Sequence, residues 1–328
     1  MIKLATIGTS AICEKFLGGA ALTKEFTLAA VYSRNYDTGK AFADKYNCKK
    51  IFTNLEEMAK SSDIDAVYIA SPNAFHYEQS RIFLENGKHV LCEKPIVTKL
   101  SQYHQLKALA DSNGIIYMEA IVSRHNKGRE KLLSAIAEIG DIRMARIDFN
   151  QRSSRLDSFL KGEKVNIFDM SLHAGTFMDL GVYCVYAAVD LFGIPKSIEA
   201  TANFFESGAD SSGCAVFDYG DFSAVLTYGK NGQGYIGSEI IGDKGVVRIS
   251  SISQYNGISI VKNGTESSLD SITSKEEVMS CEAQKFADYI LRYKENSTDY
   301  DAVSSLCADV HYCMDKIKIK AGIIYPDN

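Results

Sequence analysis

The sequence predicts an α/β protein that joins a doubly wound parallel sheet to a C-terminal α+β domain with a mostly antiparallel open sheet. Three observations predict this fold. Apolar runs alternate with amphipathic segments over the first part of the chain, at the spacing of βαβ units. Further on, longer segments of alternating polarity follow one another without helices between them. The 328 residues also exceed what one hydrophobic core usually serves, so we expect two domains, 1–120 and 121–328.

The first predicted domain contains six strands joined by five helices. The strands are expected at residues 2–7, 27–33, 51–52, 66–70, 89–92 and 115–118. The helices are expected at residues 11–22, 38–46, 54–60, 74–86 and 99–112. Gly87 and Gly114 each follow an asparagine after one of these helices, where glycine ends a helix in the left-handed conformation.

The second predicted domain contains longer strands and one strongly apolar helix. The strands are expected at residues 142–149, 197–204, 212–217, 222–228 and 234–241. The helices are expected at residues 128–138, 174–192, 275–293 and 300–321. Gly193 and Pro195 end the apolar helix, and the two C-terminal helices are amphipathic, so we expect them to pack over the sheet or back on the first domain.

Composition narrows the possible partners. A net charge of −5 argues against nucleic acid, which would need a clustered basic surface. No stretch approaches about 20 uninterrupted apolar residues, and a strand begins at once, so we expect neither a membrane span nor a signal peptide. The eight cysteines form no C-x-x-C pair, which favours reduced thiols over disulfides or a zinc site. We therefore expect a cytoplasmic protein without a metal.

The turn after the first strand lies where a Rossmann fold places its glycine-rich phosphate loop. Of the three glycines in that motif only Gly8 is present, although Ser10 and Cys13 are small enough for a pyrophosphate to approach the backbone. An ordinary tight turn is the alternative. The residues expected to contact the cofactor here are Gly8, Thr9, Ser10, Ala11 and Ile12.

The end of the second strand indicates which nicotinamide cofactor is used. An NAD-selective fold usually places a carboxylate there, but this chain has Ser33 and Arg34. A serine hydroxyl can donate to a 2′-phosphate, and a guanidinium can pair with it. The sequence therefore favours NADP over NAD, while a merely solvated surface arginine is the alternative.

Two further loops lie at strand carboxyl ends, where open α/β sheets bind ligands. One contains Ser71, Pro72, Asn73 and His76, and the other is Glu93-Lys94-Pro95. Together with the Gly8 turn, the Met178-Asp179-Leu180-Gly181-Val182-Tyr183 segment and the Gly242-Asp243-Lys244-Gly245 turn, these loops closely resemble the Gfo/Idh/MocA family of oxidoreductases. The nearest match in motif is the branch of dihydrodiol dehydrogenase and glucose-fructose oxidoreductase.

The resemblance implies an NAD(P)-dependent dehydrogenase or reductase that acts on the CH–OH group of a sugar, a cyclic polyol or a related alcohol or carbonyl. It implies that both loops contact the cofactor, through Ser71, Pro72, Asn73, His76, Glu93 and Lys94. It also implies that the second domain's sheet lines the active site and mediates a homodimer or homotetramer. A non-catalytic NAD(P)-binding sensor or regulator of the same fold is the alternative function.

The resemblance identifies Lys94 as the catalytic lysine, whose pKa we expect partial burial to lower. Asp179 and Tyr183 are four residues apart on the apolar helix and therefore share a face. We expect Lys94 and Tyr183 to hold the substrate oxygen, one transferring its proton, while Asp179 orients the substrate or tunes Lys94. Alternatively, Asp179 pairs with a backbone or basic group and Tyr183 belongs to the core.

Other polar residues are candidates by position. Glu119 ends the sixth strand, where it contacts cofactor or substrate, or anchors the interdomain hinge through a salt bridge. His76 either touches the nicotinamide side of the site or is a structural histidine at a helix N-terminus. Arg124, His125 and His173 are further candidates for the substrate pocket.

Overall fold

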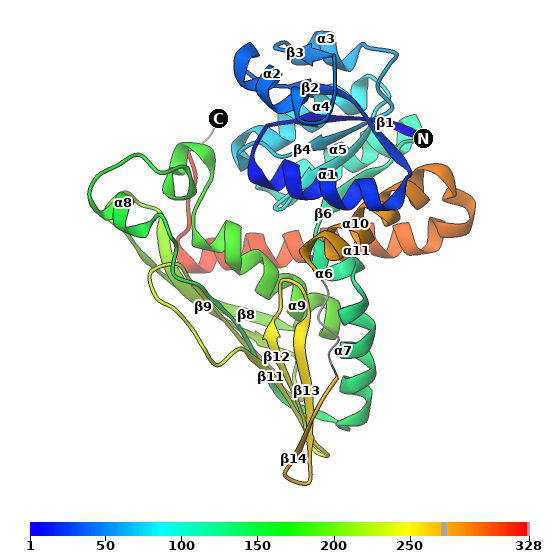
Figure 1. Cartoon of the computed structure of the whole chain (residues 1–328). Coiled ribbons are helices and arrows are strands. Elements are labelled where there is room, and N and C mark those ends of the chain that lie inside the picture. Colours follow the sequence, from blue (N-terminus) through cyan, green and yellow to red (C-terminus); the bar gives the residue numbers. More distant parts are fainter. Residues whose placement is uncertain (270–273, 327–328) are drawn as a thin grey trace. The chain divides into compact units, whose positions relative to one another are not determined.

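The computed structural model describes residues 1–269 and 274–326 (Figure 1). The chain divides into two compact units, one formed by residues 1–122 with 273–305 and the other by residues 123–272 with 306–328. We call them unit 1 and unit 2. The segment 273–305 belongs to unit 1 although it lies far along the chain. The predicted division into 1–120 and 121–328 assigns this segment to the second domain.

Unit 1 contains a six-stranded sheet in the order β3-β2-β1-β4-β5-β6, in which the paired strands are parallel (Figure 1). The sequence of crossovers reverses between β1 and β4, so the doubly wound prediction is confirmed, and ligands bind such sheets at this point. The strands are β1 (Ile2–Ile7), β2 (Phe26–Tyr32), β3 (Ile51–Phe52), β4 (Ala66–Ile69), β5 (His89–Glu93) and β6 (Tyr117–Ala120).

The crossover helices of unit 1 lie where the sequence predicts them. They are α1 (Ala11–Thr23), α2 (Tyr36–Asp44), α3 (Leu55–Ala59), α4 (His76–Glu85, after a 3₁₀ turn at Asn73–Phe75) and α5 (Leu100–Asn113). The two predicted glycine caps are confirmed, because Gly87 has φ +70° and Gly114 has φ +64°. β6 begins two residues later than predicted, since the Ile115 N–H still donates to the Ala110 carbonyl at the end of α5.

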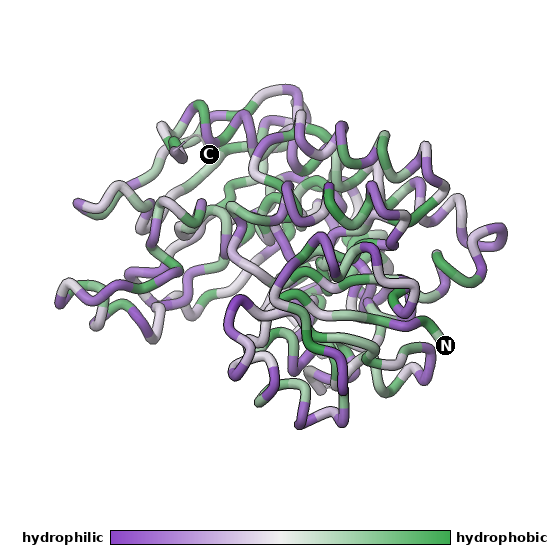
Figure 2. The backbone as a smooth tube through the Cα atoms, turned by 90° about the horizontal axis from the view of Figure 1, so that it is seen from above, coloured by the Kyte–Doolittle hydropathy of each residue, from purple (hydrophilic) through white to green (hydrophobic). Residues whose placement is uncertain are grey.

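Two helices close the chain, α10 (Lys275–Leu291) and α11 (Tyr293–Ala321), and the second begins earlier than predicted. α10 packs against α1 in unit 1. A Cβ on Gly19 would lie 2.6 Å from the Cβ of Met279, so only glycine permits this approach. Ser274 and Glu277 form a capping box that fixes the start of α10. Hydrophilic segments lie mostly at the outer turns of the chain (Figure 2).

Unit 2 contains an eight-stranded sheet in the order β14-β13-β12-β11-β7-β10-β9-β8 (Figure 1). The β7–β10 pair is parallel and the other pairs are antiparallel, which confirms a mostly antiparallel sheet. The strands are β7 (Ile142–Asn150), β8 (Ser197–Phe204), β9 (Asp210–Asp218), β10 (Ser223–Gly229), β11 (Ser238–Gly242), β12 (Val246–Ser251), β13 (Asn256–Lys262) and β14 (Thr265–Ser268). The prediction missed the last three strands.

Two helices, α7 (Lys127–Glu138) and α9 (Val182–Phe192), pack on one face of this sheet (Figure 1). The helix predicted at 174–192 is confirmed, but its first part is a π-helical turn at Phe177–Gly181 that continues directly into α9. Gly181 makes room for this wider turn, because a Cβ there would lie 2.5 Å from Cδ2 of Phe177. The remaining helices are α6 (Val122–His125) and α8 (Leu156–Leu160).

One helical stretch, Met170–Phe192, has the length and apolarity of a membrane span, and 72% of its most apolar window is buried within the protein. Such burial is what the core helix of a folded domain shows. The eight cysteines are all free thiols, and six of them are buried.

Candidate active site

The turn after β1 is shaped by Gly8, whose φ is +113°. A Cβ at this position would lie 2.9 Å from the carbonyl oxygen of Ala70, so a larger residue meets both strain and backbone. Within the described chain, the exposed Ser10 side chain makes no capping bond at the start of α1. The start of α1 therefore has no side-chain cap from Ser10, and the N-terminus of a helix attracts an anion such as a pyrophosphate.

Ser33 and Arg34 follow β2, and Arg34 is exposed. The Asn35 N–H donates to Oγ of Ser33 at 3.3 Å, which leaves the serine hydroxyl proton available for another acceptor. The Asn35 side chain then caps α2 by accepting from the Thr38 N–H at 2.9 Å. The segment is thus fixed at the carboxyl end of β2, where Arg34 is exposed and Ser33 is half-buried.

His76 joins the two loops that carry the family resemblance. Its side chain is buried, with Nδ1 2.9 Å from the Pro95 carbonyl oxygen and Nε2 2.8 Å from the Ser71 carbonyl oxygen. Burial lowers the pKa of His76, although the two carbonyl contacts oppose this shift, and a neutral ring can donate to only one of the two oxygens. Ser71 is held in addition by its hydroxyl, which donates to Oε1 of Gln79 at 2.6 Å. Of the two roles predicted for His76, the structural one at a helix N-terminus has direct contacts.

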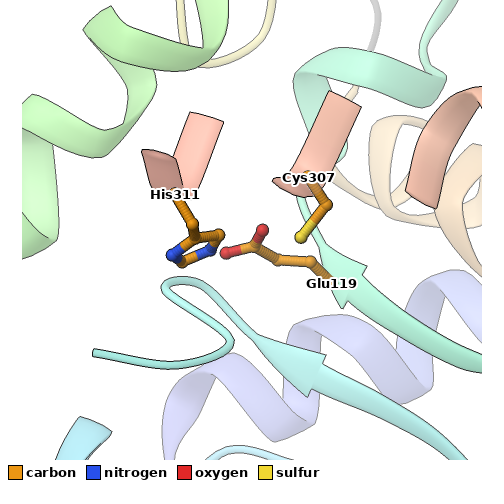
Figure 3. A group of neighbouring side chains, drawn as sticks. All are labelled: Glu119, Cys307 and His311. Atoms are coloured by element: carbon orange, nitrogen blue, oxygen red, sulfur yellow. The ribbon is translucent and has the colours of Figure 1, made fainter. Parts of the chain in front are cut away.

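Lys94 lies directly after β5 and is half-buried. The Lys94-Pro95 peptide is cis. On the far side of the loop, the Ile96 N–H donates to Oε1 of Glu119 at 2.8 Å, and Glu119 is itself buried at the end of β6 (Figure 3). The same figure shows Cys307 and His311, one turn apart on α11. Glu119 therefore supports the loop that carries Lys94, a role that neither sequence alternative included.

A buried acidic group lies behind this loop in unit 1. The Tyr68 hydroxyl donates to Oε1 of Glu93, the residue before Lys94. Glu282 on α10 is fully buried, and neither of its carboxylate oxygens has a hydrogen-bond partner among the described residues. Burial raises the pKa of Glu282 far above its usual range, with Glu93 and Glu119 adding to the effect. Burial therefore favours the neutral form of the Glu282 carboxyl, and no sequence motif predicted this residue.

Asp179 and Tyr183 share one face of the apolar helical segment, as predicted. They are the two partly exposed residues in 175–189, where every other residue is buried. The π-helical turn keeps both on one side, because four residues make close to one full rotation there. Tyr183 packs edge-on against Phe149 of β7, with ring centroids 5.7 Å apart. Within residues 175–189, polar side chains reach the surface on this face alone.

Asp179 has a partner that sequence analysis missed. Its Oδ2 pairs with Nζ of Lys230, a buried lysine that directly follows β10. The basic partner required by the structural alternative is thus present, although Lys230 lies 51 residues from Asp179 in the chain. A single lysine after a strand matches no sequence motif, so the sequence alone did not single out Lys230. The one available signal was that an aspartate in so apolar a segment needs a partner.

The positional candidates lie against other protein groups. Nε of Arg124 is 3.9 Å from Oδ1 of Asp190, which also binds Arg129 through two hydrogen bonds. His173 is buried with φ +51°, and its Nε2 lies 3.0 Å from the Pro326 carbonyl oxygen. Its ring also packs on Tyr325, with centroids 5.3 Å apart. His173 therefore contacts the C-terminal segment, and His125 is half-buried at the end of α6.

Comparison with known families identifies both parts of the chain. The model of an oxidoreductase family with an NAD-binding Rossmann fold, Gfo/Idh/MocA, matches residues 2–121. The model of the Gfo/Idh/MocA C-terminal domain matches residues 131–248. The two matches agree with the observed fold, in which a doubly wound sheet is followed by a mostly antiparallel sheet.

Several curated proteins resemble this chain over its length. A scyllo-inositol 2-dehydrogenase (NADP(+)) of Bacillus subtilis is 37% identical over 99% of both chains. An uncharacterized oxidoreductase of Escherichia coli is 36% identical over 99% of this chain and 98% of its own. A trans-1,2-dihydrobenzene-1,2-diol dehydrogenase of Xenopus tropicalis is 28% identical over 91% of each.

Solved structures share the fold. A 3-ketoreductase from Actinomadura kijaniata, solved with NADP and TDP-benzene, superposes with a TM-score of 0.82 at 21% identity, covering 98% of both chains. A biliverdin reductase from Synechocystis, solved with biliverdin and NADP+, has a TM-score of 0.81 at 15% identity. At these identities the likeness concerns the fold.

Proposed function

Because the chain belongs to the Gfo/Idh/MocA family of NAD-binding oxidoreductases, we propose that it transfers a hydride between NADP and the CH–OH carbon of a sugar or cyclic polyol. The observation that carries the proposal is the half-buried Lys94 after β5, in a loop held by His76 on one side and Glu119 on the other. A proton-transfer group benefits from such fixed placement.

The residues of unit 1 fit a dinucleotide. Gly8 brings the backbone close where a Cβ would not fit, and the first amides of α1 are suited to the pyrophosphate. Ser33 and Arg34 would hold the 2′-phosphate of NADP, which agrees with the name of the Bacillus subtilis relative. Ser71, Pro72, Asn73 and Glu93 would line the rest of the site. When bound, the nicotinamide ring supplies or accepts the hydride.

The chain's own residues must manage the proton. An alcohol that loses hydride from carbon must also lose a proton from oxygen, and the reverse holds for a carbonyl. We propose that Lys94 and Tyr183 bind the substrate oxygen and that one of them exchanges this proton. Asp179, whose carboxylate is partly exposed, accepts a hydrogen bond from a further substrate hydroxyl and orients the ring.

The substrate class follows from the relatives and from the site. Two of the relatives are named as dehydrogenases of an inositol and of a cyclic diol, both of which carry hydroxyls on neighbouring carbons. We propose that this chain also acts in the cytoplasm. We further propose that its copies associate through the open face of the unit 2 sheet, where Met144 and Val216 are exposed.

Steady-state assays test the proposed function. The purified chain is assayed with NADP+ or NAD+ and a panel containing scyllo-inositol, myo-inositol, D-glucose and trans-1,2-dihydrobenzene-1,2-diol. We expect turnover with NADP+ and at least one panel member. Lys94→Ala should abolish turnover yet leave NADPH affinity within twofold, and the exposed Lys49→Ala serves as its control. Full activity of Lys94→Ala would refute the role, and binding without turnover in the wild type would favour a sensor.

A further inference from the structure

Lys230 is a buried cation whose ammonium group pairs with a partly exposed carboxylate. The residue is 4% exposed, whereas the Asp179 side chain keeps 42% of its surface accessible. Taking an ammonium out of water costs several kcal/mol, and one ion pair often fails to offset that cost. Replacing a buried ion pair by apolar residues of similar volume is often neutral for stability or stabilising. The presence of a lysine therefore points to a role for the charge itself.

Hydrogen bonds fix the backbone of Lys230 on both sides, so the side chain that carries the ammonium group starts from a fixed position. Its N–H donates to the Ser211 carbonyl oxygen at 3.0 Å, and its own carbonyl accepts from the Ser153 N–H at 2.9 Å. The ammonium also lies 5.9 Å from the centroid of the Phe168 ring. A long flexible side chain is thereby held in one arrangement before any substrate binds.

The neighbouring strand fixes the same helical turn. Oδ2 of Asp210, at the start of β9, accepts from the Phe177 N–H at 2.6 Å. The Thr176 hydroxyl donates to the Asp210 carbonyl oxygen at 2.8 Å. The backbone of the π-helical turn is therefore anchored by Asp210 and Thr176. Lys230 pairs directly with the Asp179 carboxylate that this turn carries.

We propose that Lys230 is a positioning residue that locks the Asp179 carboxylate in the orientation that accepts a substrate hydroxyl. This inference rests on the proposed function, because it assumes that Asp179 binds substrate. Its effect is on substrate binding and alignment, not on the fold or on the dinucleotide. Two fixed strand ends, β9 and β10, thus set the geometry of the face that carries Asp179 and Tyr183.

The test compares Lys230→Met, which keeps the length of the side chain but removes its charge, with Lys230→Arg and the exposed Lys196→Met. On the panel member with the highest turnover, we expect Lys230→Met to raise KM and lower kcat/KM on the order of tenfold. Lys230→Arg should recover part of this loss, and Lys196→Met should match the wild type. The thermal stabilisation by that polyol, measured with NADPH present, should fall in Lys230→Met, while the Kd for NADPH stays within twofold.

A double-mutant cycle with Asp179→Asn separates positioning from general packing. If Lys230 acts through Asp179, adding Lys230→Met to Asp179→Asn lowers kcat/KM no further. Multiplied losses, or a Lys230→Met enzyme with unchanged KM, would overturn the inference. If Lys230→Met does not fold, Lys230→Gln carries the same test, because it donates a hydrogen bond without the charge. A wild type that turns over no panel member would instead count against the proposed function.

Discussion

Nδ1 of His76 lies 2.9 Å from the carbonyl oxygen of Pro95, so an imidazole ring joins the start of α4 to the cis-proline loop after β5. The other ring nitrogen lies 2.8 Å from the Ser71 carbonyl oxygen. Because both proposed cofactor loops meet at this ring, the placement of Lys94 depends on a side chain that need not touch any ligand. His76 is therefore a positioning residue for both loops.

Replacing His76 tests this arrangement. His76→Ala leaves the Pro95 and Ser71 carbonyls without the ring between them, and a lost buried hydrogen bond costs about 1–3 kcal/mol. We expect NADPH affinity and kcat to fall together, each on the order of tenfold. Fluorescence titration of NADPH and steady-state assays measure the two effects. The exposed His104→Ala on α5 is the control, and a loss confined to kcat would contradict a shared role.

Cofactor selectivity depends on Ser33 and Arg34. Removing a charge-assisted contact to the 2′-phosphate costs about 1.5–3 kcal/mol, so Arg34→Ala should weaken NADPH by roughly 10- to 100-fold. NADH lacks that phosphate and should bind this variant as it binds the wild type. Titration of both reduced cofactors by calorimetry measures the ratio.

Ser33→Asp gives the converse test of selectivity. A carboxylate at the end of β2 repels the 2′-phosphate and can accept from the ribose hydroxyls, so preference should move toward NADH. Lys49→Ala, an exposed basic residue elsewhere in unit 1, should change neither affinity. Equal losses of NADH and NADPH in Arg34→Ala would mean that this arginine packs on the adenine and does not select the phosphate.

The sequence predicted those features that depend on local signals. The glycine after each of two helices predicted the left-handed caps at Gly87 and Gly114. The carboxyl ends of the strands predicted where the loops that carry His76 and Lys94 lie. Lys230 escaped prediction because its significance arises only when β10 is folded beside the π-helical turn. β14 was missed because it is short, polar and exposed, which weakens the pattern of a half-buried strand. β12 and β13 do alternate between buried and exposed residues, and the prediction overlooked that pattern.

Gly8 supports a prediction about the phosphate turn. Gly8→Ala puts a Cβ 2.9 Å from the Ala70 carbonyl oxygen at a φ of +113°, so we expect a destabilisation of about 1–3 kcal/mol and a marked loss of NADPH affinity. The matched control is Gly87→Ala, where φ is +70° but no atom lies within 4 Å of the added Cβ. It should lower stability without changing NADPH affinity. Calorimetric unfolding and NADPH titration separate strain from the effect on the site.

Glu282 gives the unfolding free energy of the protein a pH dependence that one substitution should remove. Burial raises the pKa of this carboxyl above its ordinary value of 4.5, so the folded chain keeps a proton that the unfolded chain releases. Since the native state then binds more protons, the stability contributed by this group is full below pH 4.5 and declines as pH rises above it.

Glu282→Gln cannot ionise, so it should be free of that decline. We expect its Tm to equal that of the wild type near pH 4 and to exceed it by a margin that grows toward pH 8, reaching at least about 2 °C. Scanning calorimetry between these values measures the margin, with the exposed Glu206→Gln as control. A Tm difference that does not change with pH would mean that the substitution acts through packing. Only a group that binds protons differently in the folded and unfolded states makes the Tm difference between variant and wild type grow with pH.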